Sequence, residues 1–355
     1  MAKQKKNNSG MRRTLIVLSI VLGVVLAALL GLTIYAESLL GKVNYVDPNA
    51  SEPTLSQAEV DAIMDNLKEE EPEDEEFEGP ELKEEEVILE TAPPIQVDTE
   101  NVVNILLIGA DRRKNEPARS DSMILCTFNK AKGTITLTSF MRDMYVKIPG
   151  YKSNRINVAY PLGGMNLLNQ TLNQNFGVET DGAVEIDFAH FEDLIDLLGG
   201  IELELTGAEA NYINRKSGSA LKAGTQTLTG EQALWYSRCR KVGGDGDFGR
   251  TNRQRIVLSK LLNEYKNKSL TELIGLMGDI LPMVTTNMTK DQMLTYVKDL
   301  FPMLANAEII TNRIPADGAY YMARINGMSV LVPDIAKNVA ILEQSLAEPA
   351  EEGVG

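Results

Sequence analysis

The sequence predicts an α/β protein, an α-β-α sandwich around a mixed central sheet, preceded by one transmembrane helix. Two observations predict the sandwich. Val102 to Ile108 is an almost uninterrupted apolar run of the kind found in buried strands, and helical and strand-like segments alternate after it. A third observation predicts the membrane helix, because Thr14 to Ile34 holds 21 uncharged residues and a bilayer needs ~20.

The apolar run from 14 to 34 has one competing interpretation, a cleaved signal peptide. The apolar core of such a peptide is usually about 7 to 15 residues long, so an uncleaved anchor is favoured. The basic residues of the N-terminus all precede the run, and acidic residues follow it. This asymmetry predicts a cytoplasmic tail over residues 1–13, a single pass through the cell membrane over 14–34, and an extracytoplasmic domain.

The segment from 35 to 100 is strongly acidic. Between Asp47 and Glu100 it holds 20 acidic residues against two basic ones, Lys68 and Lys83, and it carries most of the net charge of −15. Like charges repel, and the segment offers little apolar surface for a core. We therefore expect an extracytoplasmic spacer, with some helix between Leu55 and Leu67.

The remaining elements follow from residue spacing and from the residues that end helices and turns. Strands are expected in a hairpin of Met123 to Phe128 and Thr134 to Ser139, over residues 201–205, and on either side of a turn at Asn326-Gly327. Helices are expected from Met165 to Phe176, Phe188 to Leu198, Gly230 to Ser237, Arg250 to Tyr265, Leu270 to Ile280, Lys290 to Leu304 and Pro333 to Leu346.

The arginines are bunched: 11 of the 15 lie between Arg112 and Arg255. In a near-neutral domain this predicts a compact anion such as phosphate, and no nucleic-acid partner is expected because such a groove needs an excess of basic charge. Cys126 and Cys239 are expected to be buried free thiols rather than a disulfide scaffold. The single His190 is expected to be structural, and the chain has no cluster of His and Cys for zinc.

The first candidate group lies at the end of the predicted buried strand. Asp111 follows Ile108 by three residues, and Arg119 and Asp121 come shortly after it. Polar residues at the end of a buried strand face a crevice. The two aspartates either share a cation such as Mg²⁺, which uses one or two carboxylates plus phosphate oxygens, or are turn and capping residues. The sequence alone leaves both interpretations open.

The densest group of arginines lies near residues 238–254. An extended backbone would turn Arg238 and Arg240 to one side and Cys239 to the other. After a glycine-rich stretch, Arg250, Arg253 and Gln254 share the start of a helix. Converging arginines repel one another unless an anion lies among them, and a diphosphate fits through bidentate hydrogen bonds. The alternative is a set of separate surface ion pairs.

Taken in order, these groups resemble the LytR-CpsA-Psr family. The resemblance runs from about 101 to 267 and rests on Ile-Gly-x-Asp, Arg-Ser-Asp, Arg-Asp, Asn-x-Ala-Tyr with Gly-Gly, Leu-Gly-Gly-Ile, Gly-Glu-Gln-Ala-Leu, Arg-x-Arg, Gly-Asp-Phe-Gly-Arg and Arg-Gln. It implies transfer of a phosphoglycopolymer, teichoic acid or capsule-like, from undecaprenyl diphosphate to peptidoglycan, outside the membrane of a Gram-positive-type envelope. It also implies a catalytic domain over 101–312, followed by a C-terminal extension over 313–355.

The resemblance also implies roles for individual residues. It places Mg²⁺ or Mn²⁺ on Asp111 and Asp121. Catalytic and diphosphate-binding positions fall on Arg119, Arg142, Arg238, Arg240 and Arg250, with Asp247 as a candidate general base. Arg155 keeps the charge of a lysine usual in the family, and we count it with Arg253 and Gln254 as substrate-binding.

Two other functions fit the same residues. A pyrophosphatase would use water in place of the acceptor hydroxyl, and a non-catalytic module would hold the lipid-linked polymer without turning it over. A transcriptional regulator does not fit a domain outside the cell. Two interpretations remain for the apolar helices from Met165 to Phe176 and from Phe188 to Leu198. They line a pocket for the prenyl chain, or most of their residues serve ordinary core packing, which is the favoured role for each residue taken individually.

Overall fold

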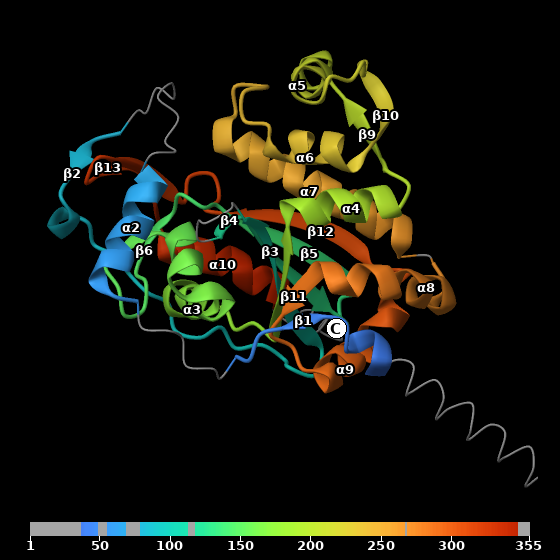
Figure 1. Cartoon of the computed structure of the whole chain (residues 1–355). Helices are drawn as coiled ribbons and strands as arrows, with labels where there is room; N and C mark the ends of the chain where they lie inside the picture. The colour runs from blue at the N-terminus through green and yellow to red at the C-terminus, as the bar shows by residue number, and fades with distance from the viewer. Residues whose placement is uncertain (1–36, 49–54, 69–78, 113–117, 267, 347–355) are drawn as a thin grey trace, which may run out of the picture.

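The computed structural model describes residues 37–48, 55–68, 79–112, 118–266 and 268–346. At its centre is a seven-stranded mixed sheet of order β1-β11-β8-β3-β4-β5-β12 (Figure 1). The strands of this sheet are β1 (Asn44–Tyr45), β3 (Val102–Asp111), β4 (Arg119–Asn129), β5 (Thr134–Phe140), β8 (Gly182–Asp187), β11 (Val284–Thr286) and β12 (Glu308–Ile314). The apolar run predicted to cross the membrane lies outside the described residues. Within them, no helix has the length and apolarity to span a bilayer.

Helices cover both faces of the sheet, which confirms the predicted layering. Leu106 and Ile108 of β3 point to the face covered by α3 and α10. Leu107, between them, points to the opposite face, where α7 and α9 pack. The helices are α2 (Gln57–Lys68), α3 (Ala159–Phe176), α4 (Phe188–Leu197), α5 (Gly207–Ser217), α6 (Gly230–Arg238), α7 (Gly246–Tyr265), α8 (Leu270–Ile280), α9 (Lys290–Leu304) and α10 (Ile335–Leu346).

The hairpin of β4 and β5 is confirmed, but β3 continues past Gly109 to Asp111, and β4 begins as early as Arg119. Apolar runs reveal only the buried middle of a strand, so its polar end was assigned to a turn. At Gly109 a Cβ atom would lie only 3.0 Å from the Cβ of Ser122, so glycine lets the two strands approach closely.

Three small sheets complete the fold. They pair β9 (Ile201–Leu205) with β10 (Gly224–Leu228), β13 (Tyr320–Ile325) with β14 (Met328–Pro333) and β2 (Glu81–Leu82), and β6 (Tyr145–Val146) with β7 (Asn154–Arg155). The burial of β9 alternates along the strand, which confirms the strand predicted over 201–205. The predicted turn at Asn326-Gly327 is also confirmed: it joins β13 to β14, and both of its residues have positive φ. The helices at α4, α8, α9 and α10 are also confirmed, within two residues at each end.

The acidic segment before residue 101 is not a separate solvated spacer. Ile63 and Ile95 are buried in the main core, and β1 and β2 each add a strand to a sheet. Likewise, Leu342 of α10 lies in the same core, so neither residue 100 nor residue 312 is a boundary in the packing. The expectation was wrong because it rested on average charge, whereas a few apolar side chains suffice to bind a segment to an existing core.

Cys126 and Cys239 are free and buried, as predicted. Burial raises the pKa of Cys126 to about 12, so this thiol stays protonated at neutral pH. His190 lies in the first turn of α4, where its Nδ1 is 3.1 Å from the carboxylate of Asp187. The contact is local to the start of this helix, in line with a structural role.

Candidate active site

The ends of β3 and β4 carry the two predicted metal ligands. Asp111 ends β3 and pairs with Arg119 at the start of β4. Gly109 pairs with Ser122 whereas Ala110 pairs with Ser120, so Asp121 is the extra residue of a β-bulge. A bulge changes the direction of the side chain that it carries. Asp121 can therefore face residues beyond the ladder.

Arg142 follows β5 and connects three carboxylates. Its Nη1 donates to Oδ1 of Asp121 at 3.1 Å. Its Nε lies 3.6 Å from Oδ1 of Asp143 and 3.7 Å from Oδ1 of Asp247. The Arg142 side chain is only 12% exposed, so these charges interact in a partly desolvated environment.

Asp247, in the first turn of α7, contacts three arginines. Nη2 of Arg250 donates to its Oδ2 at 2.7 Å, and Nε of Arg240 lies 3.3 Å from its Oδ1, on the side of Arg142. Nη1 of Arg250 also lies 4.0 Å from Oδ1 of Asp121. A carboxylate held by three guanidinium groups positions them, and this arrangement favours positioning over the general-base role considered from the sequence.

Arg238 ends α6 and lies at the edge of the same group. Its Nη2 is 4.0 Å from Oδ2 of Asp111, and its guanidinium lies over the ring of Phe188, 4.6 Å from the centroid. Cys239 has an extended backbone and is 1% exposed. Arg238 itself is helical, so the extended segment considered for residues 238–240 begins only at Cys239.

Asp143 completes the group, and the sequence reasoning gave it no role. Its Oδ1 lies 3.5 Å from Nη1 of Arg155 and close to Arg142. Burial alone would raise the pKa of Asp143, but these neighbouring arginines outweigh it and lower the pKa. The signal was present in the sequence as the adjacent pair Arg142-Asp143, but adjacency in sequence does not reveal which arginines a carboxylate will face.

We define the arginine cluster as Arg119, Arg142, Arg155, Arg238, Arg240 and Arg250. Five of them lie within 4.0 Å of a carboxylate of Asp111, Asp121, Asp143 or Asp247, and Arg119 pairs with Asp111 across the β3–β4 ladder. Burial, reinforced by Arg142 and Arg240, lowers the pKa of Arg250 to about 10. The buried Nε atoms of Arg142 and Arg250 have no hydrogen-bond partner among the described residues. The cluster therefore suits an anion such as phosphate.

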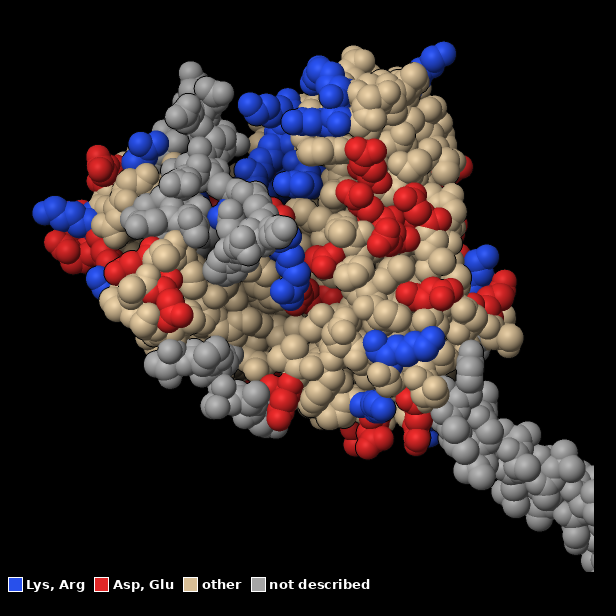
Figure 2. All heavy atoms as spheres, in the orientation of Figure 1, with Lys and Arg blue, Asp and Glu red and all other residues tan. Residues whose placement is uncertain are grey.

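Basic side chains gather on one face of the molecule, close to the ends of α6 and α7 that meet at the cluster (Figure 2).

Arg253 does not belong to the arginine cluster, although we predicted that it contacts the substrate. Its three nitrogens bond to Oε1 of Glu209 and to the carbonyls of Cys239 and Val242, at 2.8, 3.2 and 3.0 Å. With its donors used in this way, Arg253 holds the glycine-rich loop in place instead of meeting the substrate.

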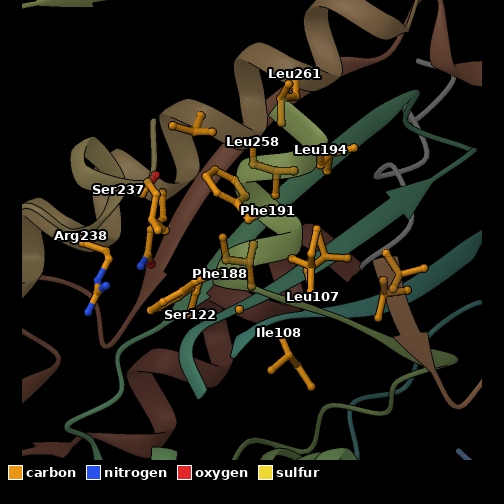
Figure 3. Close-up of a pocket in the computed structure, with 18 residues that line it drawn as sticks. Leu107, Ile108, Ser122, Phe188, Phe191, Leu194, Ser237, Arg238, Leu258 and Leu261 are labelled. Carbon is orange, nitrogen blue, oxygen red and sulfur yellow. The ribbon is translucent and has the colours of Figure 1, made fainter. Parts of the chain in front are cut away.

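An apolar pocket of about 240 Å³ opens beside the cluster (Figure 3). Phe188, Phe191 and Leu194 of α4 line one side and Leu258 and Leu261 of α7 the other, with Arg238 at one end. Gln254 is a further lining residue. The prediction for α4 is confirmed, but the predicted contribution of α3 is wrong, because its apolar residues are in the core on the opposite face of the sheet. The α7 side was missed, although the spacing of Gln254, Val257, Leu258 and Leu261 marks one helical face.

Asp111 and Asp121 suit a divalent cation. They lie at the ends of neighbouring strands, and their side chains are 11% and 16% exposed. The described residues form no group of three or more His, Cys, Asp and Glu that could hold a metal. Magnesium is compatible with two carboxylates when phosphate oxygens and water supply the other ligands.

The order of motifs and this geometry agree with a comparison of known families. A model described as the LytR_cpsA_psr family matches residues 57–346. The chain belongs to the LytR-CpsA-Psr family. The match includes α2 and α10, so it extends beyond residues 101–312 on both sides.

LytR-CpsA-Psr relatives with assigned names are similar over most of the chain. A Bacillus cereus protein named polyisoprenyl-teichoic acid–peptidoglycan teichoic acid transferase TagU is 36% identical over 251 residues, 68% of this chain and 78% of the relative. A Bacillus licheniformis protein of the same name is 31% identical over 253 residues, 69% of this chain and 80% of the relative.

Two solved LytR-CpsA-Psr structures have a similar fold. A structure of TagT bound to LIIa-WTA has 27% identity and a TM-score of 0.57, and the match covers 70% of this chain and 91% of that one. A crystal structure of B. subtilis TagT has 25% identity and the same TM-score of 0.57, with 73% and 99% covered. The central mixed sheet is therefore shared with this family.

Proposed function

We propose that this chain transfers a teichoic acid-type phosphoglycopolymer from a polyisoprenyl diphosphate carrier to peptidoglycan. The observation that carries the proposal is an apolar pocket that meets a cluster of arginines at Arg238. Such a site suits an amphiphile with a diphosphate joined to a hydrocarbon chain. The names of relatives up to 36% identical supply the polymer and the acceptor.

The reaction is a substitution at phosphorus. An oxygen of the acceptor hydroxyl forms a bond to the phosphorus that carries the polymer, the bond from this phosphorus to polyisoprenyl phosphate breaks, and the proton of the hydroxyl passes to the leaving phosphate or to water. Arg142, Arg240 and Arg250 would stabilise charge on the phosphorus oxygens and on the leaving phosphate. Asp121, Asp143 and Asp247 would hold these guanidinium groups in position before the substrate arrives.

A pyrophosphatase would use the same arginines with water as the acceptor. Transfer is favoured because the named relatives that match about two thirds of this chain are transferases. The two activities differ in product, since transfer places the polymer phosphate on peptidoglycan whereas hydrolysis releases it. A non-catalytic binding module would yield neither product.

The pocket provides a direct test of the carrier. Leu194→Trp should fill the pocket beside Phe191 and reduce the polyisoprenyl lipid retained by the purified chain by about tenfold or more, since each lost CH₂ contact costs ~0.8 kcal/mol. Leu197→Trp, on the same helix but 37% exposed and outside the pocket lining, is the matched control and should retain lipid. Mass spectrometry of extracted lipid measures both. Equal retention would place the isoprenoid elsewhere.

For the cation, we propose that Asp111 and Asp121 bind Mg²⁺ or Mn²⁺, which would neutralise charge on the diphosphate. Asp121→Asn should raise the metal concentration required for half-maximal transfer at least about tenfold, because a neutral amide is a poorer ligand for a hard cation. Asp299→Asn, the same change at an exposed position of α9, is the control and should not alter the requirement. An unchanged metal titration of Asp121→Asn would make both aspartates structural.

We also propose that residues 14–34 anchor the chain in the cell membrane, with the domain outside. The support is the length of the uncharged run and the basic residues before it. A chain that begins at Glu37 should leave the membrane fraction while the full chain remains in it. Retention of the shortened chain in membranes would argue against this anchor.

A further inference from the structure

Helix α7 has two functional faces. With 3.6 residues per turn, the side that carries Arg250 and Gln254 meets the cluster and the apolar pocket. The opposite side lines a second groove of about 310 Å³, whose lining residues are mostly of polar types. From α7 this groove receives Asn252, Arg255, Ile256, Ser259, Lys260 and Asn263. No role in the proposed reaction has been given to any of these residues.

The walls of the groove come from two strands that α7 contacts, β9 and β12. Glu202 and Glu204 belong to β9, and Thr311 belongs to β12. The lining therefore combines hydroxyl, amide, acidic and basic groups. This mixture suits a ligand with many hydrogen-bonding groups and few charges.

Arg255 is buried in this groove without a counter-ion. It is 8% exposed, and its single hydrogen bond in the described structure runs from Nη2 to Oδ1 of Asn252 at 3.3 Å. Its Nε and Nη1 have no partner among the described residues, and one turn later the buried Oγ of Ser259 has none either. By contrast, Arg253 two residues earlier has protein acceptors for all three nitrogens. A buried guanidinium without acceptors is costly, and a bound ligand would offset this cost.

The charged residues near Arg255 pair with one another, and none of the described residues forms an ion pair with Arg255. Lys260 pairs with Glu202 at 3.2 Å, and Arg313 donates to Asp317. Burial, and then the charge of Arg313, lower the pKa of Arg255 to about 10, so it is still protonated at neutral pH. Glu204 of β9 adds a negative charge to the lining. The four charged residues of the groove therefore sum to zero, which does not attract a polymer of dense negative charge, while Arg255 forms no ion pair among the described residues.

Resting on the proposed function, we propose that this groove binds the acceptor: a peptidoglycan glycan strand with its attached peptide, with a peptide carboxylate on Arg255 and the hydroxyl and acetamido groups of the sugars on Asn252, Ser259 and Asn263. A phosphate-rich polymer fits less well, because Glu202 and Glu204 would repel its closely spaced charges. The groove and the arginine cluster lie on opposite sides of one helix, about 10–12 Å across. In this proposal the strand runs from the groove past the N-terminal end of α7, which carries Asp247 and Arg250, to the phosphorus.

The first test is binding of a soluble, uncrosslinked peptidoglycan fragment to the full chain in detergent. Arg255→Met keeps the length of the side chain and removes its charge and donors, and it should weaken binding by about 10- to 100-fold, as expected for one charge-assisted hydrogen bond. Ser259→Ala should weaken binding by a smaller factor. Glu264→Gln, on α7 but outside the groove lining, is the control and should bind normally.

The second test separates binding from a structural role. In the transfer assay, Arg255→Met should raise the KM for peptidoglycan about tenfold or more and leave the KM for the lipid-linked donor within twofold. Its thermal midpoint should stay the same or rise, because an uncompensated buried charge is removed. A lower midpoint together with parallel changes in both KM values would overturn the proposal and make Arg255 structural.

Other outcomes are equally decisive. Unchanged affinity of Arg255→Met for the fragment would exclude the groove as an acceptor site. A variant that instead loses affinity for a glycerol phosphate oligomer would show that the groove holds the polymer, against our proposal. If the unaltered chain transfers no polymer, the proposed function fails, whereas the fragment-binding result still decides the groove.

Discussion

Replacing Arg240 by Lys is expected to slow transfer by roughly 10- to 100-fold with little change in the thermal midpoint. Nε of Arg240 lies 3.3 Å from Oδ1 of Asp247, and the side chain is 25% exposed. A guanidinium can hold Asp247 and two phosphate oxygens with separate donors, whereas an ammonium offers one compact charge. Lysine preserves the positive charge but lacks the paired N–H donors of a guanidinium. A lower transfer rate would therefore report the lost hydrogen-bond geometry and not a change in net charge.

Two further variants sharpen this test. Arg324→Lys, on the exposed side of β13, is the matched control and should leave both transfer and stability unchanged. Arg250→Lys should reduce both, because the Arg250 side chain is 4% exposed and lies between Asp247 and Asp121. The measurements are single-turnover transfer and thermal unfolding. Near-normal transfer by a stable Arg240→Lys would remove Arg240 from the phosphate site.

Removing residues 1–100 is expected to destabilise the domain by several kcal/mol or to prevent its folding. Ile63 and Ile95 are 6% and 9% exposed in the main core, and burying an aliphatic side chain contributes about 1.5–3 kcal/mol. Domains are stable by only about 5–15 kcal/mol. Leu82, Val87 and Leu89 also pack on the core beneath β13 and β14. This outcome is the opposite of what the acidic composition alone predicts.

The backbone contacts of the segment support the same expectation. The amide of Ala92 donates to the carbonyl of Asn175 at 3.2 Å, and the amide of Ile95 donates to the carbonyl of Gly177 at 2.8 Å. A Cβ atom on Gly177 would lie 2.1 Å from the carbonyl oxygen of Pro93, so the segment lies directly on the end of α3.

The control is a chain that begins at Glu37 and keeps all of these contacts. Denaturant unfolding of the two shortened chains measures the difference. Equal midpoints would show that residues 37–100 are dispensable for the fold.

Much of the fold follows from local spacing. The buried strand at Val102, the β4–β5 hairpin and the helices that end at Gly177 and Gly199 were predicted, because side-chain periodicity and backbone freedom act within a few residues. The order of short motifs was likewise sufficient to indicate the family. Element ends were predicted less well. The first turn of α3 is separated from the rest by non-helical backbone at Gly163 and Gly164, and α7 begins with a polar turn that contains glycine and carries no apolar period.

The charged site was predicted only as a set of residues. Spacing alone indicates that Arg238 and Arg240 share a side of an extended backbone. In the structure Arg238 is instead the last residue of α6 and contacts Asp111, whereas Arg240 contacts Asp247. Spacing does not show that Arg253 turns to Glu209 and to two carbonyls, because these acceptors come from α5 and from the loop before α7. Neither does it show Asp143 among the arginines.

By itself, then, the sequence determined the α-β-α layering, the glycine helix ends, the free thiols and the chemistry of an arginine-rich anion site. Only the tertiary structure decided that Asp121 leaves its ladder at a bulge, that α4 and α7 enclose the apolar pocket, and that Ile63 and Ile95 enter the core. The physical reason is the distance along the sequence over which each effect acts. Periodicity and turn chemistry act between neighbours, whereas bulges, pockets and ion pairs depend on which distant segments the core brings together.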